Sequence, residues 1–463
     1  MKIIVDNVIK ILDADEKILK FCKQELEIDN PQFEQNKRLG FPVYNIPRKL
    51  IWWERKGKEL IVPFGCFQKI WELHPIKDDF EVKITKIKPV KYKSNIRLYD
   101  YQEKACKSIV SSKNGILVMP AGSGKTQTAL EAIARLGLKT LWVTHTMDLL
   151  NQSYDRAKNN FENVDLGKIA SGKIEIGEHI TFATVQTLAK SNLLELKDEW
   201  DMIIGDEIHR MCGTPAQAGM FFKVFNSLSA RYKIGITATN YRNIKGTEKA
   251  MYIGIGDVFC EIPKETVSDR VIKAQIQKIK TNYKINENCQ KTDGTIDYSK
   301  LTSDLAINQE RNEIILDLLK KEEGNSVLVL GDRLNQLEYL QQQLGYGVKI
   351  DGTMTSKKNK ALREQYIQDM REGKENVLFA SYGLAKEGLD IPRLKILILA
   401  SPHRDKATII QSVGRIERKF ENKTNPVVYD IVDNTIFHEN MWKSRKTIYR
   451  KNGNKIYELW RIN

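Results

Sequence analysis

Residues 119–126, MPAGSGKT, follow the apolar run GILV and precede QTALEAIARLG, whose apolar residues recur at helical spacing. A strand, a glycine-rich turn and a helix in this order place backbone N–H groups and the positive end of a helix dipole around one point, which suits a phosphate chain. Gly122 and Gly124 let the backbone approach closely, Lys125 can reach the β and γ phosphates, and the Thr126 hydroxyl can bind Mg²⁺. A methionine replaces the first glycine of the strict pattern, but the strand–turn–helix context still predicts a nucleotide site.

A pair of acids after a later apolar run extends this interpretation. The segment DMIIGDEIH ends an apolar strand with Asp206 and Glu207, and ligands gather beyond the carboxyl ends of strands in a parallel sheet. Asp206 can hold Mg²⁺ through its water shell, and Glu207 can orient or deprotonate the water that attacks a γ phosphate. An isolated DE pair at a strand end is usually a solvated turn, but its position after the GKT turn favours the catalytic interpretation.

A third segment, ATIIQSVGRIERKF, carries two arginines far along the chain. Its helical spacing predicts Gln411, Arg415 and Arg418 on neighbouring turns, so that two guanidinium groups could point at one anion. If the two halves of the chain face each other across a cleft, these arginines act as arginine fingers. The alternative is an exposed basic helix face.

The order of apolar runs predicts an α/β fold with parallel sheets. From about residue 94, short β-branched runs alternate with amphipathic stretches, and after a gap the pattern repeats, which indicates two α/β domains in tandem. The predicted strands are GILVM, TLWVT, ITFAT, DMIIGD and KIGITAT, then NSVLVLGD, NVLFAS, KILILAS and PVVYDIV. Residues 286–300 are predicted as an exposed loop or linker. Residues 1–93 form a separate small α+β domain, in which IWWERKGKELIVPFG predicts a hairpin with strand-like runs on either side of ERKGKE.

The composition describes a basic globular protein of 463 residues with a formal net charge of +15, which favours a polyanionic partner. Six scattered cysteines show no metal or disulfide spacing. No run is long enough to span a bilayer and no secretory signal is recognised, so we expect a cytoplasmic protein with no membrane partner.

Basic residues exceed acidic ones by five in 1–93 and again by five in 434–463. Aromatic residues lie among these charges, which suits base stacking, although a core role is equally compatible. They are Trp52, Trp53, Phe64, Phe67 and Trp71, then Trp442, Tyr449, Tyr457 and Trp460.

The ordered motifs resemble those of superfamily 2 helicases of the DExH type over most of residues 96–420. The matching segments are LYDYQEKA, MPAGSGKT, LWVTHTMDLLNQ, ITFATVQTL, GDEIH and GITAT, followed by SVLVLGDRLNQLEYL, VLFASYGLAKEGLDIP and QSVGRIER. With its small preceding domain, the chain looks most similar to phage branched-DNA helicases of the UvsW type and their XPB-like relatives. Several motifs in the family's order are far more specific than any one of them.

The resemblance implies two RecA-like domains, 94–265 and 266–463, with ATP and Mg²⁺ between them, and makes residues 1–93 a DNA-recognition domain. The implied catalytic residues are Lys125, Asp206, Glu207, Gln411, Arg415 and Arg418. The implied nucleotide-binding set is Gln102, which reads adenine, Ala121, Gly122, Ser123, Gly124, Lys125, Thr126, Gly388 and Asp390, with Thr126 and Asp206 toward the metal. The implied nucleic-acid contacts are Thr144, Thr184, Gln186 and Ser381, and the residues that couple hydrolysis to movement are His209, Thr237 and Thr239.

We therefore expect a nucleic-acid-dependent ATPase, a monomeric DNA helicase that unwinds or branch-migrates forked and junction DNA. The family travels from 3′ to 5′, although the sequence itself carries no direction. Three alternatives stay open: an RNA helicase, a duplex-DNA translocase that does not separate strands, and a nucleic-acid-binding scaffold with an inactive motor. The intact lysine, glutamate and arginines argue against the last of these.

Overall fold

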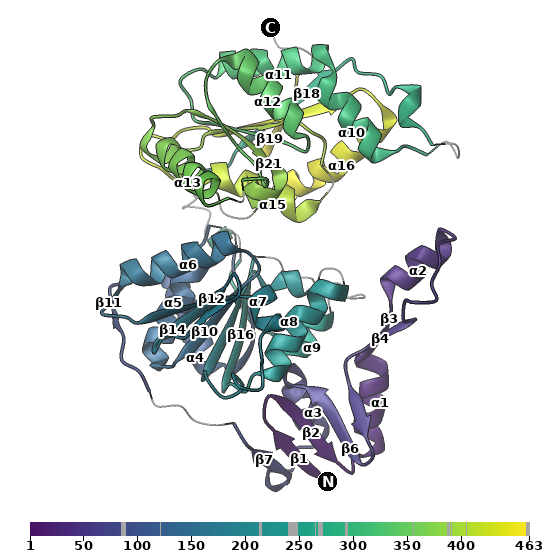
Figure 1. The fold of residues 1–463 in the computed structure, drawn as a ribbon, viewed down its shortest axis with the longest axis vertical. Coiled ribbons are helices and arrows are strands. Elements are labelled where there is room, and N and C mark those ends of the chain that lie inside the picture. Colours follow the sequence, from purple (N-terminus) through teal and green to yellow (C-terminus); the bar gives the residue numbers. More distant parts are fainter. Residues whose placement is uncertain are drawn as a thin grey trace. The chain divides into compact units, whose positions relative to one another are not determined.

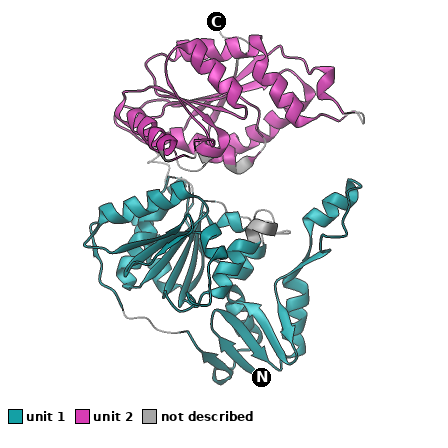
Figure 2. Cartoon of the chain, in the orientation of Figure 1, with its two compact units in different colours: residues 1–266 teal, residues 267–463 magenta. Residues whose placement is uncertain are grey.

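The computed structural model describes residues 1–84, 89–120, 122–212, 215–238, 249–263, 265–266, 272–291, 295–354, 356–386, 389, 391–403 and 405–459. The chain forms two compact units, unit 1 with residues 1–266 and unit 2 with residues 267–463 (Figure 2). Among the described residues, no helix has both the length and the apolar character needed to cross a bilayer.

Unit 1 begins with a five-stranded sheet in the order β5-β6-β2-β1-β7. Its strands are β1 (Lys2–Val5), β2 (Val8–Leu12), β5 (Glu54–Lys56), β6 (Glu59–Pro63) and β7 (Phe80–Val82). Helices α1 (Glu16–Glu25) and α3 (Phe67–Leu73) accompany this sheet. Alternate residues of β1 and β2, such as Ile3 and Ile9, are fully buried, as expected for strands with one face on a core. We call residues 1–84 the N-terminal domain.

The hairpin predicted within residues 51–65 exists, and its second strand is close to the predicted run, but its first strand begins later in the chain than predicted. Strand β5 is the polar segment Glu54–Lys56 itself, and it pairs with β6 so that Lys56 lies opposite Glu59. Gly57 has a φ of +61°, which a two-residue hairpin turn requires. The prediction failed because β5 is an exposed edge strand, which needs no apolar residues.

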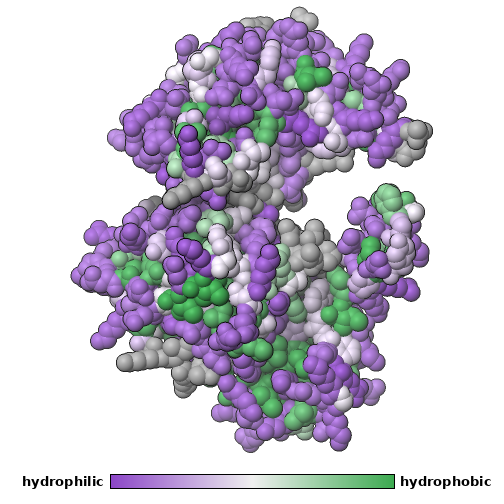
Figure 3. Space-filling model, in the orientation of Figure 1, coloured by the Kyte–Doolittle hydropathy of each residue, from purple (hydrophilic) through white to green (hydrophobic). Residues whose placement is uncertain are grey.

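An arm extends from the N-terminal domain. It consists of β3 (Glu27–Asp29) and β4 (Lys49–Ile51), paired antiparallel, and α2 (Pro31–Arg38) between them (Figure 1). Beyond α2, Leu39 and Phe41 are more than half exposed, and hydrophobic side chains are visible at this end of the arm (Figure 3).

The rest of unit 1 is an eight-stranded sheet in the order β13-β12-β14-β10-β15-β16-β9-β17. All neighbouring pairs are parallel except β12 with β13. The strands are β9 (Asn114–Val118), β10 (Thr140–Thr144), β12 (Leu166–Ala170), β13 (Lys173–Glu175), β14 (Ile180–Thr184), β15 (Met202–Asp206), β16 (Tyr232–Thr237) and β17 (Val258–Glu261). A separate antiparallel pair joins β8 (Lys93–Ser94) to β11 (Phe161–Glu162).

Helices cover this sheet on both faces, since buried residues from alternate positions of β9, β10, β14 and β15 join two different hydrophobic clusters. They are α4 (Asp100–Ser111), α5 (Lys125–Leu136), α6 (Met147–Asn160), α7 (Val185–Lys190), α8 (Pro215–Ser227) and α9 (Lys249–Ile255).

Unit 2 has a seven-stranded, wholly parallel sheet in the order β20-β21-β19-β22-β23-β18-β24. Its strands are β18 (Gln275–Thr281), β19 (Val327–Gly331), β20 (Val348–Ile350), β21 (Val377–Ser381), β22 (Ile396–Leu399), β23 (Val427–Asp433) and β24 (Lys455–Leu459). Its helices are α10 (Tyr298–Ile307), α11 (Gln309–Lys321), α12 (Leu334–Leu344), α13 (Lys357–Glu372), α14 (Tyr382–Lys386), α15 (Lys406–Ile416) and α16 (Ile436–Lys451).

The two parallel sheets share one topology. In chain order, β18 to β24 occupy the same places in the unit 2 sheet as β9, β10, β12, β14, β15, β16 and β17 occupy in the unit 1 sheet. The predicted α/β fold with tandem parallel sheets is confirmed. All nine predicted strands are present, but the region predicted as a loop or linker contains the start of α10, and Cys289 within it is buried.

The N-terminal domain is anchored to the large sheet of unit 1 by a buried lysine. Lys233, in β16, donates from Nζ to the carbonyl of Asn7 at 3.0 Å and to that of Phe225 at 2.6 Å. Its ammonium also lies 4.5 Å from the centre of the Phe64 ring. Asp6 reinforces the contact, because it accepts from Ser229 Oγ at 2.7 Å and pairs with Lys197.

A close backbone approach completes this interface. A Cβ atom built on Gly65 would lie 2.4 Å from the carbonyl oxygen of Ile253 and 2.6 Å from the nitrogen of Ile255. Only glycine therefore lets the N-terminal domain approach α9 this closely.

We predict that Gly65→Ala separates the N-terminal domain from the rest of unit 1. The new methyl group meets backbone atoms that cannot rotate away, so we expect a loss of about 2 kcal/mol of stability, typical of overpacking. Denaturant unfolding and limited proteolysis would measure it. Gly352→Ala is the matched control, because its Cβ would meet nothing within 4 Å. Equal stability of the two variants would contradict the prediction.

We also predict that Lys233 makes stability depend on pH. Burial lowers the pKa of Lys233 to about 7, partly opposed by the charge of Asp6, whereas an unfolded lysine titrates at about 10.4. Between these values the native state binds fewer protons, so the free energy of unfolding rises with pH, by up to about 1.4 kcal/mol per unit. Denaturant unfolding from pH 7 to 10 should show this slope. Lys233→Met should lose it and the exposed Lys113→Met should keep it, so parallel profiles for all three proteins would refute the prediction.

Candidate active site

The glycine-rich turn leads directly into α5 and has the features that a phosphate site requires. Gly122 and Gly124 have φ values of +76° and +82°, a left-handed conformation that favours glycine. Gly124 is the N-cap of α5, and no side chain caps the helix there. Within the described part of the chain, Ser123 Oγ is buried without a hydrogen-bond partner. A helix N-terminus without a side-chain cap and an unsatisfied hydroxyl fit a bound phosphate chain.

Two residues of α4 and its preceding turn brace this loop. Gln102 Nε2 donates to the Ser123 carbonyl at 2.8 Å, and its Oε1 accepts from Tyr99 N at 3.0 Å. The Tyr101 hydroxyl donates to the same Ser123 carbonyl at 3.0 Å. Sequence analysis singled out Gln102 but missed Tyr101.

The acid pair lies at the carboxyl end of β15, close to the turn. Lys125 Nζ is 4.0 Å from Glu207 Oε1. Glu207 has a φ of +50°, a conformation that costs energy for a residue with a side chain and that often marks functional sites. Burial, and then the neighbouring charge of Glu207, raise the pKa of Asp206 to about 6, while the positive charges of Lys125 and Arg156 oppose the shift. Burial and the neighbouring acid thus disfavour the charged form of Asp206, and a bound cation would stabilise it, which suits a metal site.

A short polar chain links the acids to the next strand of the sheet. His209 Nδ1 lies 3.2 Å from Glu207 Oε2 and 3.1 Å from Thr237 Oγ1. Thr237 is the last residue of β16, and both His209 and Thr237 are buried. Two of the three residues to which the resemblance assigned coupling, His209 and Thr237, are therefore in contact.

Arg156 is a site residue that sequence analysis missed. It projects from α6, and its Nη1 donates to Thr126 Oγ1 at 3.1 Å. It therefore holds the hydroxyl predicted to bind Mg²⁺ and adds positive charge beside Asp206. No local motif marks it, since the contact depends on how α6 packs beside α5.

Two family models and several relatives match this chain. Residues 95–242 match the family described as "Type III restriction enzyme, res subunit", and residues 310–419 match the "Helicase conserved C-terminal domain". The "DNA 3'-5' translocase XPB2" of Sulfurisphaera tokodaii is 28% identical over 364 residues, which cover 71% of this chain and 80% of that protein.

The chain belongs to the superfamily 2 helicases.

Two further comparisons extend this assignment. A protein of Acanthamoeba polyphaga mimivirus, provisionally named ATP-dependent RNA helicase L396, is 28% identical over 490 residues, covering 99% of this chain and 87% of its own length. The structure of S. cerevisiae Dbp5 bound to RNA and ADP BeF3 has a TM-score of 0.57 at 16% identity, covering 78% of this chain and 89% of that one. This last likeness establishes the RecA-like fold. The helicase is thus a nucleic-acid-dependent ATPase by family.

The predicted nucleic-acid contacts of unit 1 gather at the carboxyl ends of β10 and β14. Thr144 and Thr184 lie opposite each other in register. The Thr144 hydroxyl is buried and donates to the Thr146 carbonyl at 3.1 Å. Gln186 Nε2 donates to the carbonyl of His145 at 2.8 Å. In unit 2 of the helicase, Ser381 ends β21, the counterpart of β14, and is half-buried.

The arginine segment differs from the sequence expectation in one respect. Helix α15 ends at Ile416, so Arg418 lies beyond the helix that carries Gln411 and Arg415. The C-cap of this helix, Glu417, is buried and accepts from Ala274 N at 3.2 Å and from Asn454 Nδ2 at 2.6 Å. Arg415 Nη1 donates to the Leu389 carbonyl at 2.9 Å. Both arginines are half-buried.

Several predicted residues lie outside the described part of the helicase, namely Ala121, Thr239, Gly388, Asp390 and Trp460. The idea that the N-terminal aromatics stack on bases is wrong for most of them, because they form that domain's core. Phe64 is buried, Trp52, Trp53 and Phe67 pack against the core cluster, and Trp71 packs on Phe80 at 5.0 Å between ring centres. Trp442 and Tyr449 are likewise buried, whereas Tyr457 is exposed.

We predict that Thr237→Val uncouples hydrolysis from movement in this helicase. The change keeps the side-chain shape but removes the hydroxyl near His209, a hydrogen bond worth about 1 kcal/mol or roughly fivefold. Strand separation should fall by about this factor while nucleic-acid-stimulated ATP hydrolysis falls less. Thr140→Val is the control, and it should leave the ratio of the two activities unchanged. Thr140 is also a buried threonine in a strand of this sheet and its hydroxyl donates to one carbonyl, but it lies at the amino end of β10, away from the site. An equal fall in both activities would contradict the prediction.

Proposed function

We propose that this protein is an ATP-dependent DNA helicase or translocase that unwinds or branch-migrates forked and junction DNA. The observation that carries the proposal is the chain of contacts from Lys125 through Glu207 and His209 to Thr237. It joins a phosphate-binding turn to the end of a strand in the same sheet. Such a connection is what an enzyme needs to convert hydrolysis into movement.

The residues of the turn and the acid pair suit hydrolysis of a nucleoside triphosphate. Lys125 would bind the β and γ phosphates, and Glu207 would take a proton from the attacking water. Mg²⁺, which Thr126 and Asp206 would hold, would neutralise charge on the phosphate oxygens. Arg415 and Arg418 of unit 2 would stabilise the transferred phosphoryl group as arginine fingers.

The proposal of DNA as substrate draws on charge and on relatives. The net charge of +15 suits a polyanion, and the archaeal relative is named a DNA 3'-5' translocase. Contacts to a phosphate backbone read shape rather than sequence, as a motor that travels along DNA requires.

The arm of the N-terminal domain supports a role in DNA recognition. Phe41 is 58% and Tyr44 84% exposed, and Lys37, Arg38 and Arg48 lie in the same segment, which contains no acid from residue 35 to residue 48. Exposed rings among basic side chains suit base stacking and phosphate contact. We propose that this arm, rather than the tryptophans that pack on the core of the N-terminal domain, contacts the branched substrate.

An RNA helicase is the second candidate. It is favoured by the mimivirus relative, which covers nearly the whole chain and carries an RNA helicase name. The two candidates share one ATP-hydrolysing motor and differ only in whether DNA or RNA is the substrate.

The experiment that tests the proposal is ATP hydrolysis with no nucleic acid, single-stranded DNA, forked DNA, a four-way junction and RNA. We expect the strongest stimulation with forks and junctions, and a fall of about a hundredfold or more in Glu207→Gln, which cannot accept a proton. Glu199→Gln is the control, because Glu199 lies in the same unit and pairs with Lys139 away from the turn.

Each outcome has a distinct meaning. Stimulation by RNA alone would replace the proposal with the second candidate. Displacement of a triplex strand without unwinding of forks would indicate a duplex translocase. Full activity in Glu207→Gln would refute the hydrolytic role of this site.

A further inference from the structure

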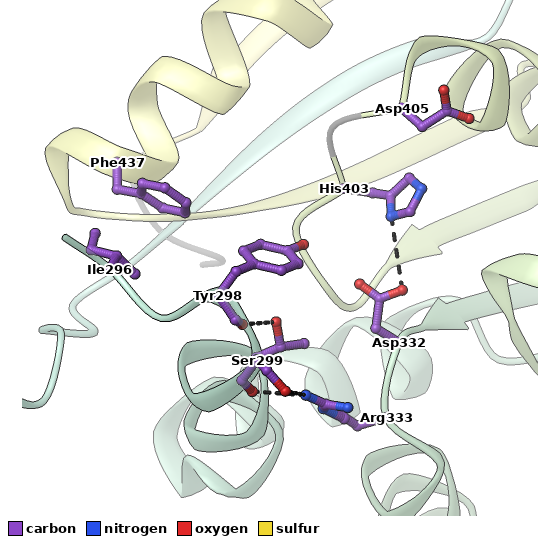
Figure 4. Close-up of a pocket in the computed structure, with 9 residues that line it drawn as sticks. Ile296, Tyr298, Ser299, Asp332, Arg333, His403, Asp405 and Phe437 are labelled. Atoms are coloured by element: carbon purple, nitrogen blue, oxygen red, sulfur yellow. Dashed lines mark hydrogen bonds and ion pairs between the residues drawn. The ribbon is translucent and has the colours of Figure 1, made fainter. Parts of the chain in front are cut away.

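Unit 2 contains a pocket of about 570 Å³ to which no role has been assigned above, although two of its residues, Asp332 and Arg333, lie in the segment SVLVLGDRLNQLEYL. Four segments line it: the residues after β19, the residues after β22, the first turn of α10 and the first turn of α16 (Figure 4). Its principal side chains are Tyr298, Asp332, Arg333, His403, Asp405 and Phe437. The volume lies within the range of small-molecule sites.

The place of this pocket in the sheet is a recurrent ligand position. After β19 the chain forms β20 and β21 on one side and then returns to β22 on the other side. The pocket therefore lies at a topological switch point, outside the carboxyl ends of the strands, where open parallel sheets bind ligands. The counterparts of β19 and β22 in unit 1 are β10 and β15, and β15 ends in Asp206. The pocket is thus the unit 2 equivalent of the nucleotide site.

The unit 2 pocket nevertheless differs from the glycine-rich turn of unit 1 in its charge and in its sequence. Asp332 and Asp405 both line it, and like charges there would repel a phosphate chain. The residues that lead into α10 do not repeat the GSGK turn, and Asp297 caps this helix instead, since it accepts from Ser299 N at 3.0 Å. The position in unit 2 that corresponds to the nucleotide site therefore has carboxylates and no glycine-rich turn.

Aromatic rings form one wall of the pocket. Tyr298 and Phe437 lie 6.4 Å apart between ring centres, and Figure 4 shows Tyr298 between Phe437 and the pair of His403 and Asp332. The Tyr298 hydroxyl donates to the Pro402 carbonyl at 2.6 Å, which fixes the ring. Planar, apolar faces of this kind bind flat aromatic ligands by stacking.

Hydrogen-bond acceptors and donors both lie close to those rings. Asp332 Oδ1 is 3.8 Å from His403 Nδ1, and both side chains remain about a quarter exposed. Arg333 Nη2 donates to Ser299 O at 2.7 Å, while in the described part of the chain its Nε is buried without a partner. The pocket thus offers carboxylate acceptors beside a guanidinium donor.

The floor of the pocket is rigid. The His403 ring stacks on Tyr382, with 4.5 Å between centres and an angle of 13°. Arg445 donates to the His403 carbonyl at 3.2 Å and forms a buried bidentate pair with Asp430. A site that is already fixed loses little entropy when a ligand binds.

We propose that the unit 2 pocket binds a nucleobase. A base would stack on the Phe437 ring beside Tyr298, whose plane is inclined to it by 48°, donate its amino N–H groups to Asp332, and accept from Arg333 through a carbonyl or ring nitrogen. The base is either an unpaired base of the bound strand or that of a free nucleoside. The first source rests on the proposed function, whereas binding of the base itself does not.

Binding of free nucleosides tests the base site directly. Saturation-transfer NMR would be recorded with guanosine, cytidine, adenosine and thymidine while ADP and Mg²⁺ saturate the unit 1 site. Because nucleosides carry no phosphate, a surface that binds only the phosphate backbone of a nucleic acid would not bind them. We expect at least one to bind with a Kd in the millimolar range or tighter, and inorganic phosphate not to compete.

Two variants assign that binding to the pocket. Asp332→Asn replaces the carboxylate acceptor and Phe437→Leu removes a ring face, and each should weaken binding about tenfold. Asp317→Asn, the same change at an exposed site on α11, should leave binding unchanged. The proposal is overturned if no nucleoside binds, or if the folded pocket variants bind as tightly as the wild type.

A labelled strand then identifies the source of the base. A single 2-aminopurine would be moved along a twelve-nucleotide strand, with fluorescence read for wild type and Phe437→Leu. A position whose fluorescence depends on Phe437 identifies the strand as the source. If nucleosides bind but no position depends on Phe437, the pocket takes a free nucleoside.

The two proposals fail separately. Stimulation of ATP hydrolysis by DNA without any nucleoside binding would overturn the base site and leave the motor intact. Nucleoside binding without stimulation by DNA or RNA would uphold the base site and refute the proposed helicase activity.

Discussion

The burial of parallel strands on both faces is the constraint on which the rest of this structure depends. In β10, β14, β15 and β16 every residue is buried. Polar groups within such strands would need partners inside the core, so chemistry is confined to the carboxyl ends, where the chain leaves the sheet. Asp206 and Thr237 are the last residues of their strands, and the glycine-rich turn follows β9. The active site is thus a consequence of how the sheet is buried.

The same burial explains which strands the sequence could predict. Runs such as TLWVT and ITFAT consist only of apolar or β-branched residues. Such a run is typical of a strand that helices cover on both faces, because neither face meets water. Strand β18, QIQKIKT, escaped prediction because it carries charges although it lies between β23 and β24. Its Lys278 is buried only because it pairs with Glu439 at 2.7 Å and lies 5.3 Å from the Trp442 ring centre. Both partners come from α16, about 160 residues later, and no local pattern could reveal them.

Site residues divide in a similar way. Lys125, Thr126 and the acid pair could be predicted, because their chemistry requires fixed spacing beside a strand or turn. Arg156 and Tyr101 could not, since their contacts depend on helix packing. Arg418 shows the limit of helical periodicity, because α15 ends before it. At that end the buried carboxylate of Glu417 accepts hydrogen bonds from Ala274, just before β18, and from Asn454, just before β24.

A single strand connects the active site to the N-terminal domain. Lys233, which anchors that domain, and Thr237, which contacts His209, are four residues apart in β16, or roughly 13 Å at ~3.3 Å per residue. Strand β16 is bonded on both sides, to β15 and β9, so the anchor of the N-terminal domain and the contact with His209 lie on one braced strand. If Thr237 couples hydrolysis to movement as predicted, the N-terminal domain would move together with this sheet. A substrate held by the arm would be carried by the same motion that the nucleotide site drives, without a separate hinge between recognition and motor.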